Sequence, residues 1–401
     1  MLKGYAKWIG LALVLVVLVL VIVFIVEAPV VEEPVVEEPV VEIPQEAEQE
    51  VTDPTVFLDA LVREGRVFSS GPAGEFPTSA AEVTLSEEEL AQIKAMNATA
   101  AIVMHYKGSD WSRAQIAGMT AQFEKMGIEL VAVTEAGFSP DDQVADIESV
   151  LAMDPDIIVS IPTDPVAVAP AFKKAADAGV KLVFMDNVPH GMVQGEDYVS
   201  VVSADNFGNG VASAHLMAKY IGGEGKIGVI YHEADFFVTR QRYEAFLETI
   251  ANYYHNIEVV ERIGITGPDF AGDAAEAASA MLVKHDDLKG IWAVWDVPAE
   301  GVMAAAREMD RTDIVITTID LGLNVAIDIA EGGMVRGLGA QRPFDQGVTQ
   351  AILAGYGLLG KEAPAFVALY MLPVNRDNIL EAWSIVYRID PPEILSDAIG
   401  N

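Results

Sequence analysis

The 401-residue sequence contains no cysteine, and this absence removes several kinds of chemistry at once. Disulfides, thiolate metal sites and a cysteine nucleophile are excluded, as is the lipidated cysteine that anchors many exported proteins. The six histidines show neither the H-E-x-x-H pattern nor another paired spacing that would indicate a metal site. A G-x-S-x-G segment is also missing, so we find no signature of a serine nucleophile.

Basic residues are scarce: Lys and Arg total 25 against 60 Asp and Glu, which gives a formal net charge of -35. Such a surface repels phosphate backbones, so nucleic acid is a poor partner, and an anionic membrane surface is equally disfavoured. The turn at Gly222–Lys226 is not a phosphate-binding loop, because Tyr220 stands at its first glycine position and Ile227 replaces the required Ser or Thr. We therefore expect no cofactor and no metal.

The N-terminus carries a long apolar run from Trp8 to Val26, made almost entirely of Leu, Val and Ile. Its length fits the ~20 residues that a helix needs to cross the hydrocarbon core of a bilayer. Lys3 and Lys7 precede the run and Glu27 follows it, so the positive-inside rule places the N-terminus in the cytoplasm. We expect residues 1–26 to be a cytoplasmic tip and transmembrane anchor. The alternative is a cleaved signal peptide, but the A-x-A cleavage form is absent.

Two further segments separate this anchor from the main part of the chain. Residues 27–54 repeat Val-Val-Glu-Glu-Pro and contain no Lys or Arg. Regular prolines and like charges favour an extended chain of ~3.1 Å per residue, so we expect a tether that holds the folded part ~80 Å or less from the bilayer. Residues 55–98 give a mixed pattern with one clear helix start, the capping box of Ser86 and Glu89. We interpret them as an N-terminal extension packed onto the main domain.

From Thr99 onward, short apolar runs alternate with amphipathic segments, which is typical of an α/β fold with a parallel sheet. Ser139-Pro140 and Asp164-Pro165 each place an N-cap residue directly before a proline, and this pattern predicts two helix starts. The predicted strands of this first unit are Ala100–His105, Leu130–Val133, Ile157–Ile161, Leu182–Met185 and Val199–Val202.

After Ser203 the alternation restarts with a helix predicted over Asn206–Ile221. Two successive units of this kind predict two similar open parallel-sheet lobes that face each other. A ligand is then expected in the crevice outside the carboxyl ends of the strands. The predicted strands of the second unit are Ile227–Tyr231, Glu258–Arg262, Ile291–Trp295, Ile314–Ile319 and Val335–Leu338.

The residues that follow these strands are aromatic and charged. Aromatic faces stack on the C–H surface of a sugar ring, while carboxylate, amide and guanidinium groups satisfy hydroxyls that would otherwise be buried unpaired. The mixture therefore favours a neutral polyol. The residues concerned are His105, Trp111 and Asp186 in the first unit and Arg240, Phe270, Trp295, Asp296, Asp320 and Gln341 in the second.

Several short segments stand in a characteristic order along the chain. They are Ala101–Met104 with Asp110-Trp111, Val183–Asn187, Ser203–Asn206, Arg240–Phe246, Trp295-Asp296, Ile319-Asp320 and Gln341–Gly347. In order and spacing the chain resembles the ribose-binding-protein family of type I periplasmic binding proteins from residue 99 to about residue 375. The resemblance implies a sugar or polyol ligand, delivery to an ABC-type permease and no catalysis.

The resemblance also implies the organisation of the two lobes. Type I binding proteins join their lobes by three crossover strands, which would lie here near 203–205, 339–341 and 367–370. Lobe 1 is then expected to comprise residues 99–204 plus 342–369, and lobe 2 residues 205–341 plus 370–401.

Carried over residue by residue, the resemblance implies individual ligand contacts. Trp111 stands where the family stacks an aromatic ring on the sugar, and Phe270 supplies a second aromatic face. Asp186 would accept hydroxyl protons and Arg240 would donate from its guanidinium group. The remaining polar contacts would come from Asp320 and Gln341.

This sequence departs from the ribose binder at three positions. Asn187 replaces a second arginine, and Trp295 replaces an asparagine. His105 replaces a small hydroxyl residue near the pocket. The ligand class is thus better supported than ribose itself.

Each of these residues also has a purely structural interpretation. Asp186 and Asp320 could cap the helices that follow them, and the two tryptophans and His105 could belong to the core. Arg240 could pair with Glu244 one helical turn later.

The function has alternatives as well. Two carboxylates in one crevice leave a glycosidase open, and a sensor of the same fold would present its closed form to a chemoreceptor or kinase. A sugar-responsive repressor is excluded, because its basic helix-turn-helix is replaced here by an apolar run and an acidic tether.

Overall fold

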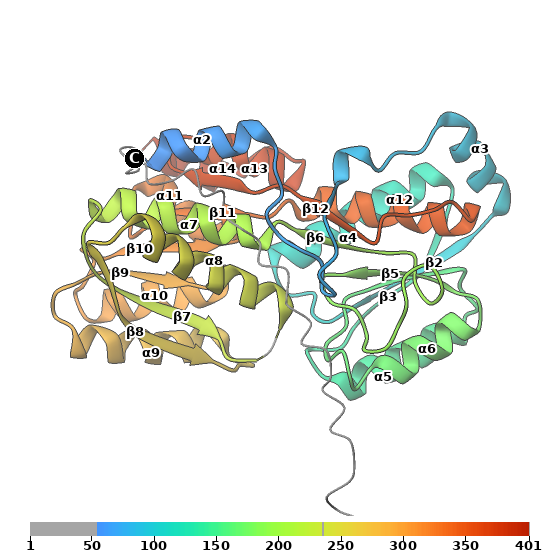
Figure 1. The fold of residues 1–401 in the computed structure, drawn as a ribbon, viewed down its shortest axis with the longest axis horizontal. Helices are drawn as coiled ribbons and strands as arrows, with labels where there is room; N and C mark the ends of the chain where they lie inside the picture. Colours follow the sequence, from blue (N-terminus) through green and yellow to red (C-terminus); the bar gives the residue numbers. More distant parts are fainter. Residues whose placement is uncertain (1–53, 235, 401) are drawn as a thin grey trace, which may run out of the picture. The chain divides into compact units, whose positions relative to one another are not determined.

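The computed structural model describes residues 54–234 and 236–400 (Figure 1). The predicted anchor at 1–26 lies outside these residues, as does the predicted tether apart from Pro54. Among the helices that are described, none combines the length and the apolar character needed to cross a bilayer.

Lobe 1 is built on a parallel sheet that is buried on both faces. Helices α4 (Asp110–Met126) and α12 (Pro343–Leu359) cover one face, and α5 (Pro140–Leu151) and α6 (Ala169–Asp177) cover the other. Strands of this kind read as continuous apolar runs because neither side meets water. In sheet order the strands are β1 (Thr78–Ser79), β12 (Phe366–Leu369), β6 (Ser200–Ala204), β5 (Lys181–Met185), β4 (Ile157–Ser160), β2 (Thr99–Met104) and β3 (Glu129–Glu135).

Lobe 2 repeats this architecture with a second sheet, in which only β13 runs antiparallel to its neighbour. One face packs on α7 (Asn206–Ile221) and α8 (Phe237–Tyr253). The other packs on α9 (Phe270–Lys284), α10 (Asp296–Glu308), α11 (Leu323–Glu331), α13 (Ile379–Tyr387) and α14 (Glu393–Ile399). In sheet order the strands are β13 (Leu372–Asn375), β11 (Val335–Ala340), β10 (Val315–Ile319), β9 (Leu288–Ala293), β7 (Gly225–His232) and β8 (Ile257–Ile265).

The two predicted parallel-sheet lobes are thus confirmed, while some local predictions are wrong. The helix predicted to start at Asp164-Pro165 begins only at Ala169, because the Asp164 carboxylate accepts the N–H groups of Val166 and Ala167 and closes a turn instead. Strand β9 ends at Ala293, so Trp295 lies beyond it as the residue before α10. The apolar runs predict no strand at β1, β12 or β13, and only the resemblance placed a crossover strand near β12.

The chain passes between the two sheets three times. It leaves the sheet of lobe 1 after β6 and enters α7 of lobe 2. It returns to lobe 1 after β11, through α12, and crosses to lobe 2 again between β12 and β13. The first and third passages are tied together, because the Asp205 N–H donates to the Leu369 carbonyl at 2.8 Å.

The extension before residue 99 contacts both lobes. Helix α2 (Pro54–Glu64) packs on α7 in lobe 2, where the Phe57 ring lies 4.7 Å from the His215 ring. Strand β1 pairs with β12 in lobe 1, and α3 (Glu87–Met96) begins at the predicted Ser86 capping box and packs against α4 and α12. The extension therefore spans the passages between the sheets.

A buried carboxylate fixes the extension to the first passage. Asp205 is fully buried and accepts N–H bonds from Phe68 and Ser69 at 3.0 and 2.9 Å, as well as the Ser69 hydroxyl at 2.9 Å. It also caps α7 through the Gly208 N–H. The Ser69 Oγ in turn accepts the Phe207 N–H at 2.9 Å. Because a buried carboxylate is stable only when its oxygens are satisfied, residues 68 and 69 are structurally required at this hinge.

This arrangement predicts the effect of a single hydroxyl. Ser69→Ala removes the Oγ that both donates to Asp205 and accepts from Phe207, so the free energy of unfolding should fall by about 1–3 kcal/mol. Urea unfolding followed by circular dichroism measures this change. Ser70→Ala is the matched control, because Ser70 contributes its backbone carbonyl, which accepts from Gln241, and it should change stability by less than about 0.5 kcal/mol. Equal effects of the two variants would show that the Ser69 hydroxyl does not fix the extension to Asp205.

Candidate ligand site

Two aspartates occupy equivalent places in the two lobes. Asp186 follows β5 and Asp320 follows β10, and each has the left-handed backbone conformation, with φ of 58° and 71°. The N–H of Asp186 donates to Val202 on β6, and that of Asp320 donates to Gly339 on β11. Both aspartates therefore stand beside a strand from which the chain crosses to the other lobe. Non-glycine residues in this conformation are uncommon and concentrate at functional sites.

A continuous chain of buried hydrogen bonds links these two aspartates. From Asp186 it runs through the Ser203 hydroxyl, which donates to Oδ1 at 2.6 Å, to the Asn206 amide at 2.9 Å. The Asn206 Oδ1 accepts from Arg242 Nε at 2.9 Å, and Arg242 Nη1 donates to Asp320 Oδ2 at 3.2 Å. This series of hydrogen bonds thus joins lobe 1 to lobe 2 through the first passage.

The series of hydrogen bonds continues from Asp320 back to lobe 1 through the second passage. Gln341 donates to Asp320 Oδ1 at 2.8 Å and accepts from Gln346 at 3.3 Å. Gln346 in turn accepts from Gln115 on α4 at 3.1 Å. Gln341 is 4% exposed and Gln346 is fully buried, so these amides are held in place by one another.

The arginine that contacts Asp320 is Arg242. Its guanidinium is 5% exposed and also approaches the Val294 carbonyl at 3.4 Å. Arg240, the residue singled out from the sequence, lies two positions earlier on α8 and is exposed. Residues two apart on a helix point to different sides, so the two arginines have different surroundings.

Aromatic rings from both lobes meet beside these polar groups. In lobe 1, His105 lies edge-on to Trp111 at 6.0 Å and to Phe138 at 5.0 Å between ring centroids. In lobe 2, Phe270 lies edge-on to Trp295 at 4.9 Å and to His232 at 5.5 Å. The Phe138 and Phe270 rings connect the two groups at 6.0 Å. The structure therefore brings together all four aromatic or imidazole residues predicted from the sequence and adds Phe138 and His232.

The aspartates and histidines beside these rings have perturbed ionisation. Burial raises the pKa of Asp186 to about 6, and burial together with the nearby Asp320 charge raises the pKa of Asp296 well above its usual range. Burial lowers the pKa of His105 to about 4 and also lowers the pKa of His232. Within the described residues, the His105 Nδ1 and Trp111 Nε1 atoms are buried without a hydrogen-bond partner. Polar atoms left in this state are available to a ligand.

A direct hydrogen bond also crosses between the lobes near this cluster. The Leu323 N–H at the start of α11 in lobe 2 donates to Asp110 Oδ2 at the start of α4 in lobe 1, at 3.0 Å. A carboxylate is stabilised at a helix N-terminus by the unpaired N–H groups and the helix dipole. This contact and the Phe138–Phe270 pair hold the two lobes together at the strand ends.

Phe138, His232 and Arg242 were not predicted as site residues from the sequence, for different reasons. Phe138 has φ of 65°, an unusual conformation for a bulky residue that no sequence pattern announces. His232 is the last residue of β7 and directly follows the predicted strand Ile227–Tyr231, so its position was available as a signal. Arg242 lies within the quoted Arg240–Phe246 segment, but the sequence alone does not show which arginine faces inward.

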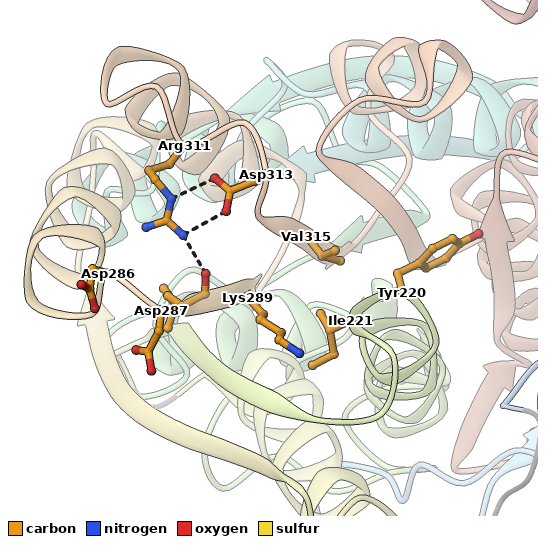
Figure 2. A pocket seen from close by; sticks show the side chains of 9 residues that line it. Tyr220, Ile221, Asp286, Asp287, Lys289, Arg311, Asp313 and Val315 are labelled. Atoms are coloured by element: carbon orange, nitrogen blue, oxygen red, sulfur yellow. Dashed lines mark hydrogen bonds and ion pairs between the residues drawn. The ribbon is translucent and has the colours of Figure 1, made fainter.

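A pocket of about 280 Å³ lies elsewhere, at the amino ends of strands in the sheet of lobe 2 (Figure 2). Its lining includes the first residues of β9 and β10, Leu288 and Val315, and the Arg311–Asp313 pair. Ligands of open parallel sheets bind at the carboxyl ends of strands, which is where Trp295 and Asp320 lie. The aspartate and aromatic cluster is therefore the stronger candidate site.

The raised pKa of Asp186 predicts a pH-dependent stability. Its folded-state pKa of about 6 exceeds the unfolded value of about 3.9, so its contribution is fully present below about pH 4 and is lost as the pH rises through 6. The Arg242 charge and the Ser203 hydroxyl oppose this shift, while the Asp320 charge adds to it. Between pH 5 and pH 7 the wild-type protein should therefore lose stability relative to Asp186→Asn.

Thermal unfolding of both proteins at the two pH values measures this difference. Asp390→Asn, at an exposed position, is the control and should change in parallel with the wild type. If the Asp186→Asn difference is the same at both pH values, the carboxylate does not titrate in this range.

Comparisons with known proteins agree with this architecture. The sequence matches the periplasmic binding protein domain over residues 100–362. The ribose import binding protein RbsB of Salmonella typhimurium is 24% identical over 251 residues, covering 62% of this chain and 80% of its own length.

Two solved structures from Agrobacterium vitis share the fold. A solute-binding protein of an ABC transporter with bound α-D-tagatopyranose has a TM-score of 0.66 at 24% identity, covering 74% of this chain and 99% of its own. A second one, with bound allitol, has a TM-score of 0.61 at 25% identity, covering 71% and 98%. The chain is a binding protein and not an enzyme: it belongs to the periplasmic binding protein domain family, in the type I class that includes the ribose-binding proteins.

Proposed function

We propose that this protein is an extracytoplasmic solute-binding protein that captures a sugar or related polyol between its two lobes and delivers it to an ABC-type permease. The observation that carries the proposal is the cluster at the strand ends, where carboxylate, amide and guanidinium groups from both lobes stand beside aromatic rings. The residues proposed to contact the ligand are His105, Trp111, Asp186, Arg240, Phe270, Trp295, Asp320 and Gln341.

The chemistry of these groups suits a polyhydroxylated ligand. Hydroxyls both donate and accept, so they can satisfy carboxylate oxygens such as those of Asp186 and also unpaired donors such as Trp111 Nε1. Aromatic faces cover the apolar side of a sugar ring. The ligands of relatives support the same class, since the named relatives bind ribose, tagatose and allitol.

The two lobes supply complementary halves of the proposed site. We assign residues 99–204 plus 342–369 to lobe 1 and residues 205–341 plus 370–401 to lobe 2. Trp111 and Asp186 come from the first, and Phe270, Trp295 and Asp320 from the second. A ligand that contacts both sets binds the closed state better than an open one, and this difference in affinity shifts the population toward closure. The closed form is what a permease would recognise.

The N-terminal residues complete the proposal. An anchor at 1–26 and an acidic tether at 27–54 would keep the folded part on the outer face of the cell membrane, close to the permease. In that position a captured ligand need not diffuse far before delivery.

A thermal-shift panel tests the proposed ligand class. Pentoses, hexoses and polyols, with D-ribose, D-allose, D-tagatose and allitol among them, should include members that raise the melting temperature, because a ligand that binds only the native state stabilises it. A variant with Trp111→Ala should lose this shift, measured against its own unliganded melting temperature. A shift caused by amino acids or nucleosides, with none from any sugar or polyol, would contradict the proposal.

Two neighbouring arginines provide a second test. Arg240→Ala should lower the unfolding free energy by less than about 1 kcal/mol, because interactions of an exposed side chain contribute little, yet weaken sugar binding by about 1.5–3 kcal/mol through a lost charge-assisted hydrogen bond. Arg242→Ala should instead destabilise the protein by about 3–5 kcal/mol, because it leaves Asp320 as an unpaired buried charge. Calorimetry and urea unfolding separate the two effects. Unaltered binding by Arg240→Ala would remove Arg240 from the site.

A further inference from the structure

The buried carboxylates of the candidate site outnumber its buried cations. Asp186, Asp296 and Asp320 are 4%, 7% and 8% exposed, and each follows a strand of one of the two sheets. The Arg242 guanidinium is buried among them, and it is bonded to Asp320. Arg240 is exposed on α8. Burial of an ionised carboxylate is costly without a compensating charge, and burial accordingly raises the pKa of both Asp186 and Asp296, so these two are the aspartates whose ionised form a positive charge would stabilise.

The two aspartates concerned are only partly satisfied by the described residues. Asp186 accepts the Ser203 hydroxyl on Oδ1, and Asp296 accepts the Val297 N–H on Oδ1. Both Oδ2 atoms lack a hydrogen bond within the described part of the chain. Each aspartate thus retains an acceptor, one from each lobe.

Among the described residues, neither the histidines of the cluster nor Arg342 supplies a positive charge to these two aspartates. His105 and His232 are the imidazoles of the cluster, and because burial lowers the pKa of both, they are uncharged at neutral pH. Arg342 is engaged at the second passage, where its guanidinium lies 3.9 Å from the centroid of the Tyr370 ring and 3.9 Å from an Asp345 oxygen.

The surrounding rings favour a cation as well. The electron-rich faces of Trp111, Phe138, Phe270 and Trp295 attract positive charge, most strongly where water is excluded. A metal ion is not favoured, because no three carboxylate or imidazole groups of the described residues are close enough to share one. The charge is better matched by an organic cation large enough to reach both lobes.

We propose that the ligand of this site carries a protonated amine, as an amino sugar or an aminated polyol does. The ammonium group would donate to Asp186 or Asp296, and the ligand hydroxyls would meet the remaining polar groups. This inference rests on the proposed function, because it assumes that the ligand binds between the lobes at the strand ends. It narrows the ligand class from neutral sugars to cationic ones.

Isothermal titration calorimetry at pH 7 tests the inference on the full-length protein. D-Glucose, D-galactose and D-mannose are compared with their 2-amino-2-deoxy derivatives and with the N-acetyl forms of those amines. At least one amine should bind tenfold or more tightly than its parent sugar. Acetylation should abolish this gain, because it keeps the substituent but removes the charge.

Variants of the carboxylates locate the effect. Asp296→Asn keeps the size and the acceptor for the Val297 N–H but removes the group that would ionise beside a bound ammonium, so it should reduce the ratio of amine to parent affinity toward one. Asp186→Asn provides the same test in lobe 1. Glu308→Gln, at an exposed position near the end of α10, is the matched control and should keep the wild-type ratio.

The outcomes separate this inference from the proposed function. Neutral sugars that bind as tightly as the amines, or more tightly, would overturn the inference and leave the proposed function standing. An amine preference that survives both Asn variants would also overturn it, since the charge would then come from another group. If no member of this set and no member of the thermal-shift panel binds, both the inference and the proposed function fail.

Discussion

The structure depends on one chain of buried hydrogen bonds that runs from lobe 1 through two interlobe passages and back. Each member satisfies its neighbour, so removal of one leaves a buried polar group unpaired at about 1–3 kcal/mol. Arg242 has the central position, because it bonds both Asn206 at the first passage and Asp320 in lobe 2. The hydrogen bonds hold the side chains of Asp186 and Asp320, both of which have the left-handed backbone conformation. The candidate site and the hinge are therefore one structural unit.

The N-terminal extension is attached to this unit and not merely to its surface. Asp205, which holds Phe68 and Ser69, directly precedes Asn206 of the hydrogen-bond chain. Helix α2 then packs on lobe 2 and strand β1 joins lobe 1. Any rotation of the lobes about the first passage must be accommodated by residues 65–77 between these two attachments. The extension thus contacts both lobes beside the hinge, and it lies outside the part of the chain that matches the family.

Local and long-range features differed in how well the sequence predicted them. Apart from β1, β12 and β13, the strands of both sheets, the α7 bounds and the strand-end aspartates follow from apolar runs and their order, because parallel strands buried on both faces leave a strong pattern. The choice between Arg240 and Arg242 depends on which side of α8 faces Asp320, which only the packing of α8 decides. The hydrogen bonds from Phe68 and Ser69 to Asp205 join residues more than 130 positions apart, and the place of the Phe138 ring in the site depends on its backbone conformation. Neither feature leaves a local signal.

The charge of the candidate site has the same sign as the charge of the whole chain. A net charge of -35 produces a field that concentrates cations near the surface and repels anions, and buried carboxylates extend this field into the site. Phosphorylated sugars and sugar acids would gain little there, because the described residues of the site offer them three aspartates and a single buried guanidinium. A neutral sugar gains nothing from the field, whereas an amine gains both in encounter rate and in the bound state. Because like charges gathered in a buried site are costly without a partner, the carboxylates are best explained by a ligand that brings the opposite charge.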